Sequence, residues 1–151
     1  MKLDSDGTVS WSFQDISAAE TGEIFMSPSF DKENNKYFGT TGGLFYCFSE
    51  EGTKLWSIKI DGEIWTKPLI DEDKTVYFGT MGDSGKHEFM AVGEGDIIWS
   101  IESEATSTGF YSSPALGISN RILVACHDGY LYSVSSETGK KTGLQTYTKS
   151  R

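Results

Sequence analysis

β-Branched and aromatic residues gather in short runs along the chain, and glycine, asparagine and acidic residues separate each run from the next. No stretch keeps the apolar spacing of an amphipathic helix for three turns. The 17 glycines and an aromatic content of 13% agree with many short strands joined by tight turns. The pattern therefore predicts an all-β chain.

The same order of runs occurs three times. Each unit begins with a tryptophan strand, and Trp11, Trp56 and Trp99 lie 45 and 43 residues apart. A strand with a proline follows, and then a strand with a glycine-containing turn. The prolines are Pro28, Pro68 and Pro114. We treat residues 1–151 as a single domain, with repeat units at about 8–51, 52–94 and 95–142.

Repeats of this length with about four strands each are typical of β-propeller blades, whose sheets need neighbours to bury both faces. The sequence thus predicts β-propeller blades, three four-stranded repeats. Closed propellers carry about four to eight blades. We therefore expect either a partial propeller within a longer chain or half of a six-bladed ring formed by two chains. The Trp11 strand would then belong to a preceding blade or complete the third blade of a neighbouring copy.

The turns before the tryptophans resemble the tryptophan-docking repeat of the quinoprotein-like (PQQ-like) β-propellers. The resemblance rests on "LDSDGTVSW", "CFSEEGTKLW" and "AVGEGDIIW", and on "SSPALGISNRILVACHDGYLYSVSSETGK" in the third unit. It implies a structural docking role for Trp11, Trp56 and Trp99, whereas Gly143 takes the place of a fourth tryptophan. Activity stays open, because repeats of this family serve enzymes, assembly factors and scaffolds alike.

A weaker resemblance, in "FYSSP" and "NRILVACHDGYLYS", is to the C-terminal repeat region of the β-alanine-activating, acyl-CoA-synthetase-like enzymes. It implies an accessory domain without the adenylating module. The quinone-dependent dehydrogenases of the superfamily use a complete, larger propeller with a vicinal cysteine pair and calcium ligands. This chain has no adjacent cysteines. We therefore expect no cofactor, PQQ included.

Charge and composition limit the classes of binding partner to be expected. Acidic residues outnumber basic ones by 22 to 13, a formal net charge of −9, which argues against binding to nucleic acid or to an anionic membrane surface. No signal peptide or transmembrane segment is visible, and the chain as written predicts a cytoplasmic protein. Cys47 and Cys126 lack metal-ligand spacing and are expected to be buried free thiols.

Candidate chemistry is sparse. His87 and His127 lie in different units and in no metal-binding motif. The acidic clusters at 31–35 and 71–74 occupy matching places and are expected to form hairpin turns. We find no nucleophile elbow, phosphate-binding loop or dinucleotide-binding motif. The sequence assigns no catalytic, cofactor-binding or metal-binding residue.

One aromatic set is left over. Phe25, Trp65 and Tyr111 each lie three residues before the proline of their unit, on the strand that lines the central channel in PQQ-like propellers. The favoured interpretation is that the three rings pack between adjacent blades. The alternative is an aromatic ring at one mouth of the channel, with Lys67 as a polar handle for a peptide, a carbohydrate or a flat ligand.

Taken together, the sequence predicts a non-catalytic binding or assembly module built from PQQ-like propeller blades. The alternative is a fragment or accessory domain of a larger enzyme, either an adenylating enzyme or another propeller enzyme, with its catalytic residues elsewhere. The expected partners are another copy of the chain or the neighbouring blades of a longer chain, and the expected ligand is a peptide or small molecule.

Overall fold

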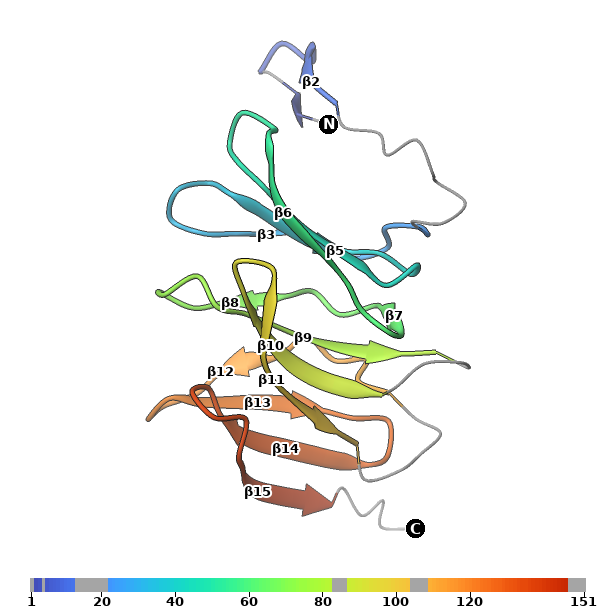
Figure 1. The fold of residues 1–151 in the computed structure, drawn as a ribbon, viewed down its shortest axis with the longest axis vertical. Coiled ribbons are helices and arrows are strands. Elements are labelled where there is room, and N and C mark those ends of the chain that lie inside the picture. The colour runs from blue at the N-terminus through green and yellow to red at the C-terminus, as the bar shows by residue number, and fades with distance from the viewer. Residues whose placement is uncertain (1, 4, 13–21, 83–86, 104–108, 147–151) are drawn as a thin grey trace.

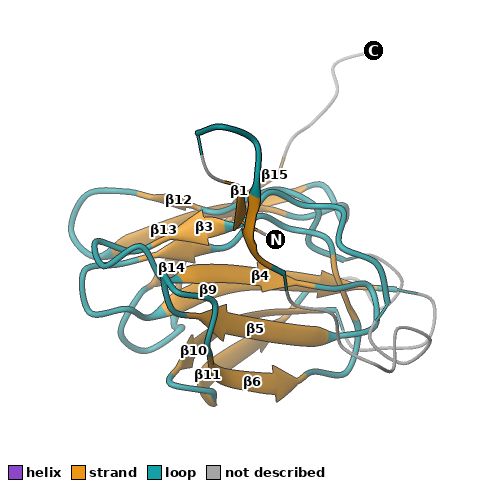
Figure 2. Ribbon diagram, turned by 90° about the horizontal axis from the view of Figure 1, so that it is seen from above, coloured by secondary structure: helices purple, strands orange, loops and turns teal. Residues whose placement is uncertain are grey.

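Three antiparallel sheets stacked face to face make up most of the protein (Figure 1). The computed structural model describes residues 2–3, 5–12, 22–82, 87–103 and 109–146. All the regular elements in these ranges are strands (Figure 2), so the described part of the chain holds no helix that could span a membrane. The predicted all-β architecture of propeller blades is confirmed.

Each sheet is built from consecutive strands in sequence order. The first sheet contains β3 (Ser29–Phe30), β4 (Lys36–Gly39), β5 (Leu44–Phe48) and β6 (Lys54–Lys59). The second contains β7 (Glu63–Ile64), β8 (Leu69–Ile70), β9 (Val76–Met81), β10 (Glu88–Gly93) and β11 (Asp96–Glu102). The third contains β12 (Ala115–Leu116), β13 (Arg121–Ala125), β14 (Tyr130–Ser135) and β15 (Lys141–Thr146). In the second sheet, β7 and β8 both pair with β9 and act as one interrupted inner strand.

The sheets are out of phase with the sequence units. Each unit begins with its tryptophan strand, whereas the strands of Trp56 and Trp99 are the last strands of the first and second sheets. The strand of Trp11, β2 (Val9–Trp11), lies outside the three sheets and pairs with β1 (Lys2–Leu3) next to the first sheet (Figure 1). Whether it belongs to a preceding or neighbouring blade stays a prediction.

One expectation is corrected. In one of the two alternatives, the Trp11 strand of a neighbouring copy completes the third blade, but β15 already pairs with β14 as the fourth strand of the third sheet. Gly143 lies opposite Ser133, the register position that Trp56 holds opposite Cys47 and Trp99 holds opposite Ala91. The tryptophan is therefore missing from the third sheet while the strand is present. The sequence suggested otherwise because a strand without its marker residue is hard to recognise.

Strand alternation gives each sheet two apolar faces, and these form two cores. Between the first and second sheets, the Phe45 and Phe78 rings stack with centroids 4.4 Å apart. Between the second and third, Phe110 packs on Phe89 and Tyr132. All five side chains are essentially inaccessible to solvent. Each sheet therefore buries at least one apolar face against a neighbour, as blades of repeat proteins do.

Two tryptophans lock adjacent sheets together. Trp56 packs over Gly95 in the hairpin of the second sheet, and Trp99 packs over Gly139 in the hairpin of the third. The indole Nε1 of Trp99 also donates a hydrogen bond of 2.8 Å to the carbonyl oxygen of Ser136. The docking role implied for these two residues is visible in their contacts. The side chain of Trp11 lies outside the described residues.

Candidate functional site: the inner strands

In the second and third sheets, a side-chain hydroxyl two residues before the proline of the inner strand bonds to the backbone of the neighbouring strand. In the second sheet the Thr66 hydroxyl accepts a hydrogen bond of 3.0 Å from the N–H of Gly79 and donates one of 3.3 Å to its carbonyl. Ser112 makes the same pair of bonds with Ala125 in the third sheet, at 2.8 and 3.0 Å. The hydroxyl thus satisfies backbone groups that a continuous strand would pair. The sequence analysis did not identify this role of Thr66 and Ser112.

At the inner strands, the space between adjacent sheets is filled by the residues directly before Trp65 and Tyr111. Ile64 packs on Gly39, and Phe110 packs on Gly79; both apolar side chains are buried. Their N–H groups donate hydrogen bonds to the preceding sheet, Ile64 to the carbonyl of Thr40 at 3.1 Å and Phe110 to that of Thr80 at 3.2 Å. The buried contact between sheets is therefore made by the residues directly before Trp65 and Tyr111. The sequence did contain a signal for this contact, because Gly39 and Gly79 occupy the same position in two repeat units.

Phe25 and Trp65 form an exposed aromatic stack. Their ring centroids are 4.8 Å apart with planes 13° from parallel, although the two residues belong to different sheets. The Trp65 Nε1 donates a hydrogen bond of 2.6 Å to the Glu63 carboxylate, which fixes the indole. Phe25 is 58% exposed and Trp65 half-buried. The two rings thus pack on each other across two sheets while Phe25 stays largely open to solvent, so both interpretations of this pair stay predictions.

Tyr111 is separate from this stack. It is 51% exposed, so its ring is not buried between two sheets. Its ring contacts the His127 imidazole edge to face, with centroids 5.3 Å apart. The structure therefore brings two of the three predicted aromatic residues into contact and places the third beside a histidine from the next hairpin.

Lys67 lies at a pocket between the inner strands. The pocket has a volume of about 440 Å³ and brings together residues of all three sheets. Its lining consists of Pro28, Ser29, Phe30, Lys67, Pro68, Leu69, Ile70, Ser113 and Pro114. Lys67 is exposed and has no ion-pair partner in the part of the chain that the structure describes. The pocket thus combines an apolar wall with one unpaired positive charge.

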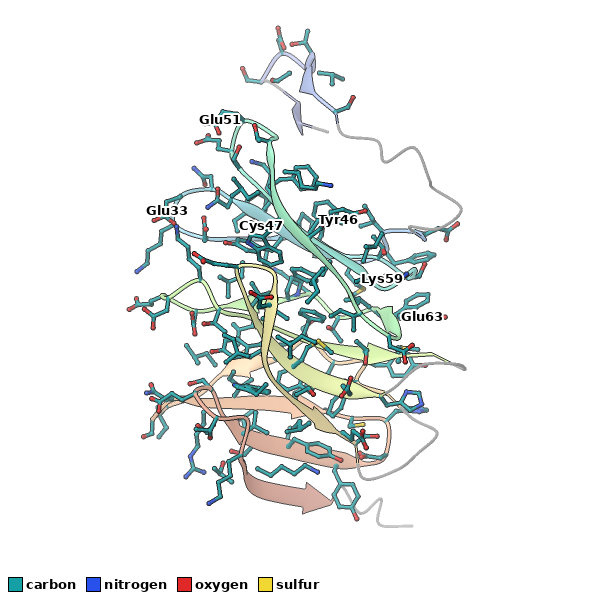
Figure 3. The ribbon with its side chains drawn as sticks, in the orientation of Figure 1. Glu33, Tyr46, Cys47, Glu51, Lys59 and Glu63 are labelled. Carbon is teal, nitrogen blue, oxygen red and sulfur yellow. The ribbon has the colours of Figure 1, made fainter. Side chains whose placement is uncertain are left out.

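The two ends of the sheets differ in character. Phe25, Trp65 and Tyr111 lie at one end, called here the aromatic end, where β9 finishes beside β7. The hairpins at 31–35, 71–75 and 117–120 lie at the other, called here the turn end, where β9 begins beside β8. Figure 3 shows Glu63 and Lys59 at the aromatic end of the three sheets, and Glu33 and Glu51 at the turn end.

The remaining titratable groups have structural surroundings. Burial raises the pKa of the Cys47 and Cys126 thiols to about 11, so both stay protonated at neutral pH. Both cysteines are free and buried, as expected. In the described ranges, no group of three or more His, Cys, Asp or Glu side chains is placed to hold a metal ion.

Stacked four-stranded sheets with tryptophans docked on the next hairpin define a PQQ-like β-propeller protein. The family model described as "Outer membrane protein assembly factor BamB" matches residues 2–151, and the chain belongs to this PQQ-like family. No curated protein sequence matches the chain.

Two solved structures share the fold. BamB from Moraxella catarrhalis is 12% identical, with a TM-score of 0.68 over 81% of this chain and 35% of that one. The quinohemoprotein alcohol dehydrogenase from Comamonas testosteroni is 13% identical, with a TM-score of 0.68 over 84% of this chain and 21% of that one. The chain thus spans about a third or less of the length of these two proteins.

Proposed function

We propose that the chain is a non-catalytic module that binds a partner polypeptide at its aromatic end. The observation that carries the proposal is the Phe25–Trp65 stack, which is formed across two sheets and remains open to solvent. Aromatic rings held in place offer large contact area at low entropic cost, and they dominate the energetics of protein interfaces. The described residues suggest no catalytic group to compete with this role.

The neighbouring pocket gives the proposed ligand a chemical character. The prolines and Phe30 offer an apolar surface, and Lys67 offers a charge that is not ion-paired within the described residues. A peptide segment with an aromatic or aliphatic side chain next to an acidic residue would contact the apolar surface and pair with the Lys67 ammonium. The broken inner strands present few free backbone groups in a row, so side-chain contacts rather than strand addition would provide the affinity.

The test is selection of short random peptides displayed on phage against the immobilised protein, followed by affinity measurement on the selected peptides. We expect these peptides to combine aromatic and acidic residues. Trp65→Ala should weaken their binding about thirtyfold or more, because central aromatic anchors contribute about 2 kcal/mol or more. Lys67→Gln should weaken binding in a salt-dependent manner.

The control variant is Ile118→Ser, which changes an apolar residue that is 88% exposed at the turn end. It should leave peptide binding unchanged. Thermal unfolding of each variant separates loss of binding from loss of fold. Selection of no peptide, or selected peptides that bind Trp65→Ala as well as the natural chain, would contradict the proposed function.

A second candidate is a part of a larger propeller enzyme whose catalytic residues lie in other blades. It is favoured by the fold shared with the quinohemoprotein alcohol dehydrogenase, of which the matched region is 21%. The mass of the polypeptide in its source cells distinguishes the two candidates. A much longer polypeptide with redox activity would support the enzyme.

We also propose that the open face of the third sheet is covered in the functional assembly, either by a second copy or by further blades of a longer chain. On that face Leu123 and Leu131 are 38% and 40% exposed. These positions correspond to Tyr77 and Phe89 of the second sheet, which are buried against the third. An apolar sheet face of this kind gains stability when a neighbour covers it.

A further inference from the structure

A second surface lies at the turn end, in the groove between the second and third sheets. The groove has a volume of about 510 Å³. Ile98 and Leu116, which are 53% and 54% exposed, give it an aliphatic surface beside the buried Tyr77. The Asp73 and Glu137 carboxylates border it. It lies at the opposite end of the sheets from Phe25 and Trp65, so it is independent of the proposed peptide site.

The base of this groove is held in one shape by the docking of Trp99. The carbonyl oxygen of Ser136 accepts the indole N–H at 2.8 Å, and the Ser136 N–H donates to the carbonyl of Asn120 at 2.9 Å. The Tyr77 hydroxyl donates a hydrogen bond of 2.7 Å to Asp71. A ligand entering the groove would therefore meet a surface that is already ordered, which reduces the entropic cost of binding.

The matching groove between the first and second sheets provides a comparison within the same molecule. It has a volume of about 410 Å³, and Leu55 lines it at the position of Ile98. Lys74 lines this first groove, with its ammonium 3.3 Å from the Glu33 carboxylate. Asn120 holds the corresponding turn position in the second groove, with φ of 54° against 64° for Lys74. The cation of the first groove is thus replaced by a neutral amide.

The charge balance of the two grooves consequently differs. Among the residues that the structure describes, no Lys or Arg lines the second groove. Asp73 and Glu137 have no ion-pair partner within the described ranges, although the Asn120 amide donates a hydrogen bond to one Glu137 oxygen at 3.0 Å. Exposed aliphatic groups flanked by unpaired carboxylates are complementary to an aliphatic side chain flanked by cations.

We propose that the groove between the second and third sheets binds a segment of a partner protein in which Leu or Ile side chains alternate with Lys or Arg. The aliphatic side chains rest on Ile98 and Leu116, and the cations lie beside Asp73 and Glu137. The formal net charge of −9 raises the local concentration of such a segment, while the aliphatic contacts select the groove. Partner recognition then occurs at both ends of the sheets with opposite charge preference.

The test uses three fluorescein-labelled peptides and fluorescence anisotropy with the full chain. The probe is Gly-Lys-Leu-Arg-Ile-Lys-Leu-Gly; one comparison peptide has Gln in place of every Lys and Arg, and another has Ser in place of every Leu and Ile. We expect the probe to bind at low salt, about tenfold tighter than either comparison peptide, and to weaken as salt screens the carboxylates. No binding of the probe, or equal binding of all three peptides, would overturn the proposal.

Matched variants in the two grooves locate the binding. Ile98→Ser with Leu116→Ser should weaken the probe about tenfold, whereas Leu55→Ser in the first groove should leave it within about twofold. Glu137→Gln should weaken it about threefold, whereas Glu94→Gln, which removes the same charge from the first groove, should not. If the double variant fails to fold, the comparison of probe affinity between Glu137→Gln and Glu94→Gln is the test of the groove. Equal weakening by both charge variants would mean unspecific attraction and would reject the groove.

Discussion

At the scale of single residues, two glycines set how closely the sheets approach at the inner strands. A Cβ atom on Gly39 would lie 2.3 Å from the Ile64 side chain, and one on Gly79 would lie 2.3 Å from the Phe110 Cβ. Real Cβ atoms do not approach so closely, so the neighbouring sheet would have to move. Ala125 holds the corresponding position in the third sheet. No described sheet covers the outward face of that sheet.

We predict that Gly79→Ala destabilises the protein by about 1–3 kcal/mol, because the added methyl overpacks the contact with Phe110. Urea unfolding followed by tryptophan fluorescence measures this change. The control is Gly143→Ala, where the nearest atom to an added Cβ is 3.5 Å away and the expected change is within about 0.5 kcal/mol. Equal stability of Gly79→Ala and the natural chain would mean that the sheets are not closely packed at this point.

At the scale of elements, two hairpins share one arrangement of hydrogen bonds. Asp31 accepts from the N–H groups of Glu33 and Asn35, and Asp71 accepts from those of Asp73 and Thr75. The predicted turns at these acidic clusters are confirmed. In the third sheet the turn instead contains Ser119 and Asn120, both with positive φ, and has no aspartate. Two local solutions therefore join the inner strand to its neighbour.

The Asp31 hairpin gives a pH prediction. Partial burial opposes ionisation of Asp31, but hydrogen bonds from Asn35, Tyr37 and the Glu33 N–H hold its pKa below the ordinary value of 3.8. The resulting stability is complete above the unfolded pKa and is lost as the pH falls through the lower folded pKa. We therefore expect the urea concentration at the unfolding midpoint to decrease as the pH is lowered below about 4. The Asp31→Asn variant should show a smaller decrease.

Asp61→Asn serves as the control for that experiment, since Asp61 is an exposed aspartate in another loop. It should leave the pH dependence of the midpoint close to that of the natural chain. Parallel pH profiles for the natural chain and Asp31→Asn would show that the hairpin hydrogen bonds do not favour the ionised carboxylate.

At the scale of the whole molecule, three stacked sheets leave outward faces that do not close into a ring. The third sheet presents Leu123 and Leu131 outward, with Gly143 where the other sheets have a docking tryptophan. A neighbour on this face would have to pack without the indole and against the Ala125 methyl. Its geometry would therefore differ from the two contacts inside the chain.

We predict that the purified chain associates through this face at micromolar concentration. Native mass spectrometry or mass photometry should detect dimers, and Leu131→Glu should return them to monomers, because it places a charge on an apolar contact. Ile118→Glu, at an apolar residue that is 88% exposed, should leave the dimers intact. A well-folded monomer at that concentration would contradict self-association and favour neighbouring blades within a longer chain.

The fold was predictable to a large extent because its signals are local and repeated. The spacing of Trp11, Trp56 and Trp99 and the turn residues between them identified the architecture and the position of Gly143. The spacing from the prolines placed Phe25, Trp65 and Tyr111 at matching positions of the inner strands, but it could not tell which inner-strand residue reaches the neighbouring sheet. That depends on the path of the chain between sheets, where Ile64 and Phe110 bond to the preceding sheet.

The sequence alone thus determined the class of fold, the repeat and its turns, because these follow from local hydrophobic alternation and backbone preference. The tertiary structure alone decided which inner-strand residues are core and which are surface. Phe25 and Trp65 are 40 positions apart in sequence and become a stack only when two sheets are stacked. The groove at Ile98 and Leu116 likewise exists only between sheets. Contacts between distant segments depend on sheet spacing, which no local pattern encodes.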